Sequence, residues 1–394
     1  MFSLRLPGSL EENAVTRALA RLQAAEVPIV DLTETNPTAV QLPYPLSALS
    51  ELADDRSLSY APQPLGTAGA RYAVAQEYVR QGVTIPLERI VLTASTSEAY
   101  SLLFKLLCDA GDEVLIPQPS YPLFEMLSRL DNVQTVPYSL QLHGHWALDR
   151  ASIERALTDR TRAVLLVTPN NPTGSLVPHE DVEWLAQMCA ARGIAIVADE
   201  VFADYRWRDE SGVAAHSVKA DTAIASRPLP ALCFSLGGLS KSAGLPQMKL
   251  GWMAVGGPEA LVAEALNRLE LICDTYLSVS TPVQVGAMSL IEGGSRVRAY
   301  ITERVLANLA TCRDMVRRRS DVTMLEPDGG WCVVLQVPAT ESEEHLVLRL
   351  LEQHHVLVHP GYFFDFPKEA FLILSLLPPA DVFTEGVERI LKGL

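Results

Sequence analysis

The sequence predicts an α/β protein with a mostly parallel sheet in a large domain and a smaller α+β domain formed by both ends of the chain. Between about residues 90 and 255, short apolar runs alternate with longer amphipathic stretches. The apolar runs lack a polar face, which is typical of strands that helices cover on both sides. Outside this region, long helical patterns and separate strand-like runs indicate a second unit.

Six apolar runs are the predicted strands of the large domain: residues 90–93, 113–117, 163–167, 194–199, 231–235 and 251–255. The stretch at 179–193, HEDVEWLAQMCAARG, separates two of them and has the apolar spacing of a helix. Because ligands of such sheets bind beyond the carboxyl ends of the strands, we expect the functional residues to follow these runs.

The smaller domain is expected from residues 1–45 and 285–394, on either side of the large domain at 46–284. In its C-terminal part, residues 297–319 have a helical pattern. Three apolar runs there are predicted strands: residues 330–337, 356–360 and 370–377.

Composition and charge exclude several classes of protein. With 394 residues, of which 48% are hydrophobic and 20% charged, the chain can bury a sizeable core. The net charge is −15 and the longest basic run is 317–319, which argues against nucleic acid or an anionic membrane as a partner. No apolar stretch reaches membrane-spanning length and the N-terminus lacks the apolar core of a signal peptide, so we expect a cytoplasmic protein.

Six cysteines are scattered along the chain without a CxxC pair. Most stand in apolar surroundings, as in ALCFS at 231–235. This pattern predicts buried free thiols rather than a disulfide framework or a zinc site.

Polar residues follow three of the predicted strands. Asn171 lies in the turn-rich segment TPNNPTG, Asp199 ends the run at 194–199, and Lys241 follows GGLS after the run at 231–235. Taken singly, each has an ordinary explanation, namely a turn, a helix cap and a solvated lysine. Together and in this order they indicate a ligand site at one edge of the sheet.

With further motifs, these residues make the chain resemble the fold-type I pyridoxal-phosphate (PLP) enzymes, specifically the class I/II aminotransferases. The matching segments are YAPQPLGTAGAR at 60–71, LTASTSEA at 92–99, PQPSYP at 117–122, TPNNPTG at 168–174, ADEVFADY at 198–205, GLSKSAGLPQMKLGW at 238–252 and PDGGW at 327–331. The resemblance implies the PLP-dependent transferase fold with a sheet of the seven-stranded type, bound pyridoxal 5′-phosphate, and a homodimer with shared active sites.

The resemblance assigns roles to residues around the cofactor ring. Lys241 is expected to form the Schiff base with the cofactor aldehyde and to carry the proton between the substrate α-carbon and the cofactor. Asp199 pairs with the pyridine nitrogen, and Asn171 donates a hydrogen bond to the ring oxygen O3′. Tyr121 stacks on the ring face, with a core tyrosine as the alternative.

The cofactor phosphate is expected at Ser95, Thr96 and Ser97, where a strand leads into a helix whose N-terminal N–H groups favour an anion. A plain Ser/Thr N-cap is the alternative. Lys249 is expected to add positive charge to the same phosphate. The resemblance implies that Tyr60 reaches this phosphate from the neighbouring subunit.

Three positions depart from the family pattern. Phe202 replaces a tyrosine that usually donates to O3′, and Lys249 replaces a phosphate-binding arginine. Ile373 stands where the family places the arginine that holds the substrate α-carboxylate. The remaining basic candidates for that carboxylate are Lys368, Arg5, Arg17 and Arg206. His359 and Tyr362 are expected near the substrate end, or else as ordinary packing residues.

The resemblance predicts an aminotransferase that moves an amino group from an amino acid to a 2-oxo acid by a ping-pong mechanism. The alternative is another PLP-dependent reaction on the same fold, such as a β- or γ-lyase, decarboxylase or oxidase reaction, or an amine substrate not anchored by the usual arginine. A non-catalytic PLP-binding module is a third class. The sequence leaves the identity of the amino donor and acceptor open.

Overall fold

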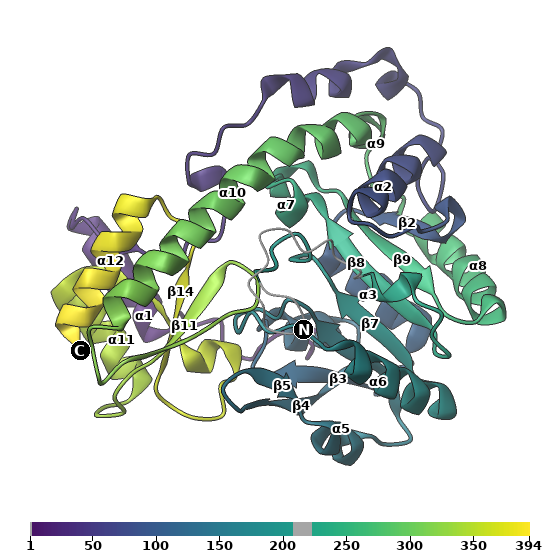
Figure 1. The fold of residues 1–394 in the computed structure, drawn as a ribbon. Coiled ribbons are helices and arrows are strands. Elements are labelled where there is room, and N and C mark those ends of the chain that lie inside the picture. The colour runs from purple at the N-terminus through teal and green to yellow at the C-terminus, as the bar shows by residue number, and fades with distance from the viewer. Residues whose placement is uncertain (1, 208–222) are drawn as a thin grey trace.

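A computed structural model describes residues 2–207 and 223–394, and its centre is an eight-stranded sheet (Figure 1). The strand order is β2-β9-β8-β7-β6-β3-β4-β5. Their bounds are β2 Ile90–Thr93, β3 Glu113–Gln118, β4 Gln134–Leu142, β5 Trp146–Leu148, β6 Thr161–Val167, β7 Ala195–Asp199, β8 Cys233–Gly238 and β9 Gly251–Gly256. The five central strands β8, β7, β6, β3 and β4 run parallel, whereas β2, β9 and β5 pair antiparallel with their neighbours.

All six predicted strands of the large domain are present, so the α/β prediction is confirmed. The sheet also contains β4 and β5, which the sequence did not reveal. Along β4, exposed and buried positions alternate and Pro137 interrupts the run, so its apolar pattern is weak. β5 has only three residues and extends the sheet as the antiparallel neighbour of β4.

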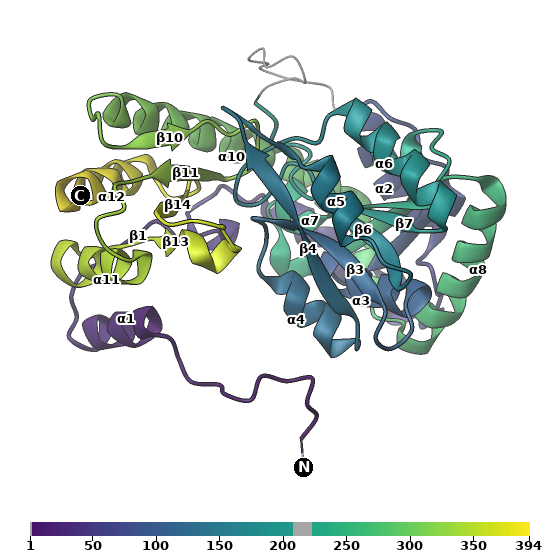
Figure 2. The same cartoon turned by 90° about the horizontal axis from the view of Figure 1, so that it is seen from below.

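Helices cover both faces of this sheet (Figure 2). In β6, Val164 and Leu166 belong to one apolar core and Leu165 to the other, which explains the absence of a polar face. One face carries α3 (Thr96–Leu107), α4 (Leu123–Leu130) and α8 (Glu259–Tyr276), and the other carries α2 (Ala68–Arg80) and α6 (His179–Arg192). The short α5 (Arg150–Ala156) packs beside β4.

Both chain ends build a second core, at the left of Figure 1. A four-stranded antiparallel sheet has the order β10-β11-β14-β13, and β1 pairs parallel with β12. The bounds are β1 Val30–Asp31, β10 Thr323–Leu325, β11 Cys332–Gln336, β12 Val356–Leu357, β13 His359–Pro360 and β14 Phe371–Ser375. Helices α1 (Ala14–Ala24), α11 (Glu343–His354) and α12 (Ala380–Gly393) pack with these strands.

The 30-residue helix α10 (Ala287–Val316) extends from the large sheet to the smaller one (Figure 1). It begins ten residues before the predicted helix at 297–319. The short helices α7 (Leu239–Ser242) and α9 (Thr281–Val285) lie near its N-terminal half. Short 3₁₀ helices occur at Pro37–Ala39 (η1), Leu46–Ala53 (η2), Asp55–Leu58 (η3), Leu87–Arg89 (η4), Ile224–Ser226 (η5), Pro246–Met248 (η6) and Gly361–Phe364 (η7).

All six cysteines are free, and five of them are buried, in agreement with the expected thiols. Within 2–207 and 223–394, no helix combines the length and the apolar character that a bilayer crossing requires.

Candidate active site

A cavity of about 160 Å³ lies at the carboxyl ends of the central parallel strands, between the large sheet and the smaller one. Its lining comes from segments that are far apart in the sequence. The lining residues are Thr35, Ser95, Thr96, Tyr121, Val167, Asn171, Asp199, Val201, Phe202, Gly238, Ser240, Lys241, Leu250, Gly251, Trp331 and Cys332. The predicted residues Lys241, Asp199 and Asn171 therefore meet at the expected edge of the sheet.

Lys241 lies in α7, directly after the end of β8. Its backbone carbonyl accepts a hydrogen bond from the hydroxyl of Tyr205 at 2.8 Å. Its Nζ lies 4.6 Å from the centroid of the Trp331 ring and 5.3 Å from that of Phe202. Burial lowers the pKa of Lys241 to about 8, although the nearby Cys332 and Asp199 favour the charged form. The neutral amine, which is both a nucleophile and a base, is thus far more abundant near neutral pH than for an ordinary lysine.

Asp199 ends β7 and is buried. Its Oδ1 accepts the N–H of Val201 at 3.2 Å, and its Oδ2 accepts the hydroxyl of Tyr100 at 3.0 Å. Burial raises the pKa of Asp199, whereas the two donors and the charge of Lys241 act in the opposite direction. A carboxylate has about four acceptor positions, so Asp199 can accept a further donor from the cavity.

The other ring-facing candidates also line the cavity. The thiol of Cys332 donates to Asn171 Oδ1, with a distance of 3.8 Å between sulfur and oxygen, which leaves the Asn171 amide N–H₂ group as a donor. Tyr121 is 38% exposed and packs edge-on against Phe124 at a centroid distance of 6.0 Å. Phe202 packs edge-on against the ring of Trp331 at 5.4 Å.

The N-terminus of α3 forms one end of the cavity. Ser95 is its N-cap: Ser95 Oγ accepts the Glu98 N–H at 3.1 Å, and Glu98 Oε2 accepts the Ala94 N–H at 2.6 Å. This reciprocal pair is a variant of the capping box in which Glu98 accepts the N–H of Ala94 instead of that of the N-cap Ser95, so the Ser95 hydroxyl serves the helix, as in the alternative interpretation. The N–H groups of Thr96 and Ser97 belong to the first turn, where intrahelical acceptors are missing.

Gly251, at the start of β9, lies directly against this turn. A Cβ atom there would lie 3.0 Å from both Thr93 Oγ1 and the carbonyl carbon of Ser95. A side chain at position 251 would therefore press on the backbone at the helix N-terminus, and glycine lets the strand and this turn approach closely.

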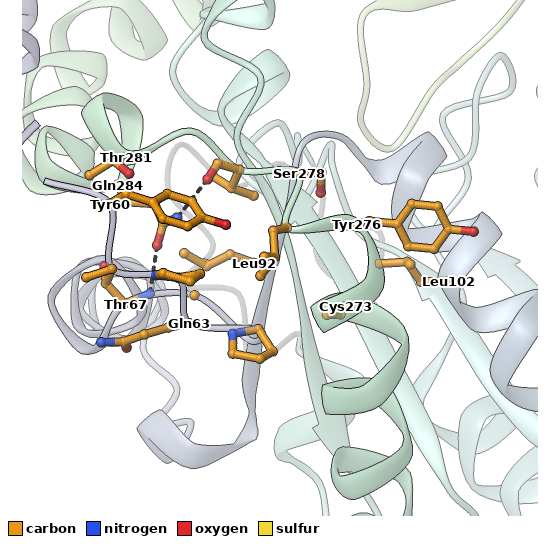
Figure 3. A pocket seen from close by; sticks show the side chains of 16 residues that line it. Tyr60, Gln63, Thr67, Leu92, Leu102, Cys273, Tyr276, Ser278, Thr281 and Gln284 are labelled. Carbon is orange, nitrogen blue, oxygen red and sulfur yellow. Dashed lines mark hydrogen bonds between the residues drawn. The ribbon is translucent and has the colours of Figure 1, made fainter. Parts of the chain in front are cut away.

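Three predicted cofactor residues do not line this cavity. Ser97 is partly buried in the first turn of α3, and Lys249 is exposed with a φ of 53° in the turn before β9. Tyr60 is 79% exposed and lines a separate pocket together with Thr67 and Gln284 (Figure 3).

The Tyr60 pocket shares no lining residue with the Lys241 cavity. The backbone N–H of Thr67 donates to Gln284 Oε1 at 2.7 Å and fixes one wall (Figure 3). The hydroxyl of Ser278, on the same wall, donates to Glu98 Oε2 at 2.7 Å. This bond joins the Tyr60 pocket to the N-terminus of α3, whose residues Ser95 and Thr96 line the Lys241 cavity.

No second cation lines the Lys241 cavity within the part of the chain that the structure describes. Ile373 is 1% exposed in β14, opposite Val334 of β11 and His359 of β13. His359 packs against the rings of Phe363 and Phe364, and burial lowers its pKa. The remaining substrate-end candidates are also absent from the lining: Lys368, Arg5, Arg17, Arg206 and Tyr362.

Several residues of the site were not predicted. Cys332 and Val201 line the cavity, and Tyr100 contacts Asp199 from α3. Trp331 could be found from the PDGGW motif, but its contact with Lys241 could not. Tyr100 had one available signal, a polar hydroxyl on the otherwise apolar buried face of a helix that starts at the predicted phosphate site.

The residues present fit PLP by the chemistry of their donors. They offer an amine for an aldehyde, a buried carboxylate for a ring nitrogen, an amide for a ring oxygen and a helix N-terminus for a phosphate. The indole Nε1 of the lining residue Trp331 is also buried without a hydrogen-bond partner in the described part of the chain.

Comparisons with known proteins show similarity to aminotransferases. The family described as aminotransferase class I and II matches residues 27–390. Among curated proteins, the chain is 25% identical to alanine aminotransferase of Mycobacterium tuberculosis over 382 residues, which cover 94% of this chain and 86% of that protein. It is 26% identical to glutamate-pyruvate aminotransferase AlaA of Escherichia coli over 323 residues, covering 80% and 78%.

Solved structures share the fold. An alanine aminotransferase from Pyrococcus furiosus superposes with a TM-score of 0.86 at 22% identity, covering 100% of this chain and 99% of that one. Aspartate aminotransferase from Thermus thermophilus with maleate gives 0.80 at 23% identity, with 100% of both chains covered. The chain therefore belongs to the class I and II aminotransferase family, and it is an enzyme that transfers an amino group.

Proposed function

We propose that the cavity around Lys241 binds PLP and uses it to move an amino group from an amino acid to a 2-oxo acid. The observation that carries this proposal is the lysine amine, with its pKa lowered to about 8, in one cavity with the buried carboxylate of Asp199. When bound, PLP supplies an aldehyde that takes up amino groups and a ring that accepts electrons released at the substrate α-carbon. The comparisons favour this transfer over elimination, decarboxylation or oxidation.

The chain's own residues divide the binding of PLP among them. Asp199 would accept a hydrogen bond from the protonated ring nitrogen, and the Asn171 amide would donate one to the ring oxygen O3′. Tyr121 covers a ring face, while Phe202 contributes apolar contact without the hydroxyl usual in the family.

The N–H groups of Thr96 and Ser97 bind the phosphate at the start of α3, where the helix dipole favours an anion. Ser95 supports this site by capping the helix. Lys249 adds positive charge from its exposed turn.

Lys241 holds and moves the proton of the reaction. Its Nζ is neutral above a pH of about 8 and can take a proton from a substrate carbon placed in the cavity. The rings of Trp331 and Phe202 exclude water on its flanks while still attracting the ammonium form by cation–π contact. Lys241 can therefore accept a proton and release it again without a large change in its own free energy.

The active unit in this proposal is a cytoplasmic homodimer in which Tyr60 serves the partner's phosphate site. Tyr60 lines a pocket that is separate from the Lys241 cavity of its own chain. Exposed apolar side chains from neighbouring segments surround α9, namely Leu46, Leu58, Tyr60 and Tyr276. A second copy of the chain covers this surface. The boundaries of the large domain lie near residues 45 and 284 in this proposal.

The test is the visible spectrum of the purified protein with PLP, before and after a pool of amino acids is added without any 2-oxo acid. The wild type should show a band that Lys241→Ala abolishes, because the band requires a covalent bond to the amine. The amino acids should convert the bound cofactor to pyridoxamine phosphate, and a 2-oxo acid should reverse this. An unchanged band in Lys241→Ala, or no conversion by any amino acid in the wild type, contradicts the proposal.

A further inference from the structure

We propose that Tyr100 is a positioning residue that keeps Asp199 ionised toward the ring nitrogen of the cofactor. The inference deepens the proposed function and rests on it, because Asp199 has this role only when PLP is bound. Tyr100 was not among the predicted site residues and does not line the cavity. It acts on the chemistry through one hydrogen bond, from its hydroxyl to Asp199 Oδ2 at 3.0 Å.

Tyr100 is held firmly in this position. It lies in the second turn of α3 and is 3% exposed. Its ring packs edge-on against Phe124 at a centroid distance of 5.2 Å and an interplanar angle of 74°. Tyr121, which covers the cofactor ring in our proposal, packs against the same Phe124 ring. The phosphate-binding helix, the stacking tyrosine and the Asp199 carboxylate are thus parts of one packed unit.

The hydroxyl of Tyr100 can act only as a donor to a carboxylate. Burial, together with the negative charge of Asp199, raises the pKa of Tyr100 well above its ordinary value, so the phenol keeps its proton. The groups that face Asp199 are the Val201 N–H, the Tyr100 hydroxyl, the Lys241 amine and the more distant Tyr121. Tyr100 is the sole neutral side chain among the described residues that donates a hydrogen bond to Asp199 in the structure.

The hydrogen bond from Tyr100 determines whether Asp199 or the ring nitrogen of the cofactor carries the proton between them. Burial favours the protonated, neutral form of Asp199. A neutral Asp199 would leave the ring nitrogen without its proton and make the ring a poor acceptor of electrons. By donating to Oδ2, Tyr100 stabilises the carboxylate and so keeps the proton on the ring nitrogen.

The test compares Tyr100→Phe with the matched control Tyr138→Phe. Tyr138 is also buried, and its hydroxyl donates to the backbone oxygen of Leu165 at 2.7 Å, away from Asp199. Each variant loses one hydroxyl and one buried hydrogen bond, and the urea midpoints of the apo-proteins report the shared structural cost. Two measurements then separate the variants: the dissociation constants for PLP and for its 1-deaza analogue, which carries C–H in place of the ring nitrogen.

Tyr100→Phe should bind PLP about tenfold more weakly and take up amino groups about tenfold more slowly, as expected for the loss of a hydrogen bond to a charged group. It should lose no affinity for the 1-deaza analogue, because that molecule offers Asp199 no proton. In an Asp199→Asn background, Tyr100→Phe should have no further effect on PLP binding. Tyr138→Phe should change the dissociation constants for PLP and for the analogue by the same factor.

Equal losses of affinity for PLP and for the analogue in Tyr100→Phe would show a structural role and overturn the inference. Unchanged PLP binding and amino-group uptake in Tyr100→Phe would overturn it as well. A wild-type protein that forms no Lys241-dependent visible band with PLP would instead refute the proposed function. These outcomes are distinguishable, because the band is measured on the wild type and the comparison on the variants.

Discussion

Lys241 combines two surroundings that oppose each other. Loss of water around the amine disfavours its charge, and burial is the largest cause of its lowered pKa. The rings of Trp331 and Phe202, 4.6 and 5.3 Å from Nζ, favour the ammonium form. Burial outweighs Cys332 and Asp199, which favour the charged form, and lowers the pKa to about 8, close to the pH at which a group that both accepts and returns a proton works best.

The lowered pKa predicts a pH-dependent cost to the apo-protein. The unfolded chain binds the Lys241 proton up to the ordinary value of 10.5, whereas the folded chain releases it near 8. Folding therefore opposes protonation, and the penalty is complete below pH 8 and fades as the pH rises to 10.5. Lys241→Met should stabilise the apo-protein by about 3 kcal/mol at pH 7.

Urea unfolding of the apo-protein and of Lys241→Met, at pH values from 7 to about 10.5, measures this effect. The difference in the free energy of unfolding should stay constant up to about pH 8 and shrink from there to pH 10.5. A difference that is independent of pH would show that the amine keeps its ordinary pKa in the fold.

Strand β14 carries the sharpest departure from the family. Its register places Ile373 opposite Val334 of β11, and the cluster around it contains Cys332, Phe366 and Phe371. The side chain is packed in an apolar core and does not line the cavity. The position therefore serves packing between the two sheets in this chain.

This packing predicts the fate of a restored arginine. Ile373→Arg should lower the free energy of unfolding by about 3 kcal/mol or more, because it buries an unpaired guanidinium. The control Ile373→Val removes a single methylene and should cost about 1 kcal/mol. Urea midpoints measure both. An Ile373→Arg protein of near wild-type stability that uses amino acids with a higher kcat/KM would instead show that the side chain reaches the substrate.

Helix α3 contributes to the site at two places, its N-terminus and Tyr100. Its capping box uses Ser95 and Glu98, and the same Glu98 accepts the Ser278 hydroxyl from the wall of the Tyr60 pocket. One turn further along, Tyr100 reaches Asp199. The helix therefore links the phosphate end of the cavity, the ring end and the proposed subunit contact.

In the molecule as a whole, the cavity lies between the two sheets, while the exposed Tyr60 lines a separate pocket. A homodimer with shared sites predicts complementation between two impaired variants. In a mixed dimer of Lys241→Ala and Tyr60→Ala, one site combines an intact Lys241 with an intact Tyr60 from the partner subunit. The other site lacks both residues.

Mixing the two variants under conditions that exchange subunits should therefore restore activity above that of either parent. The maximum is one functional site per mixed dimer. Size-exclusion chromatography with light scattering gives the oligomeric state in parallel. Activity that equals the average of the two parents, in a protein shown to exchange subunits, would place Tyr60 outside the shared site.

The sequence was most informative where the residues of one function are contiguous. The run at 194–199 predicted both the strand β7 and the carboxylate at its end, because an apolar strand and its first polar residue are read together. The same holds for Lys241 after β8 and for the start of α3. Strand β4 was missed, because its exposed positions and Pro137 hide the apolar pattern and its place in the sheet depends on pairing with β3.

The residue types of the chemistry, a lysine, an aspartate and an asparagine in fixed order after buried strands, follow from the sequence alone. Their environment does not, because it depends on contacts between segments that lie far apart. Trp331, next to β11, lies beside the Lys241 amine, and Tyr100 of α3 reaches Asp199. The register of β14 places Ile373 opposite Val334. Burial and hydrogen bonding set the pKa values of Lys241 and Asp199, and both arise only when the chain is packed.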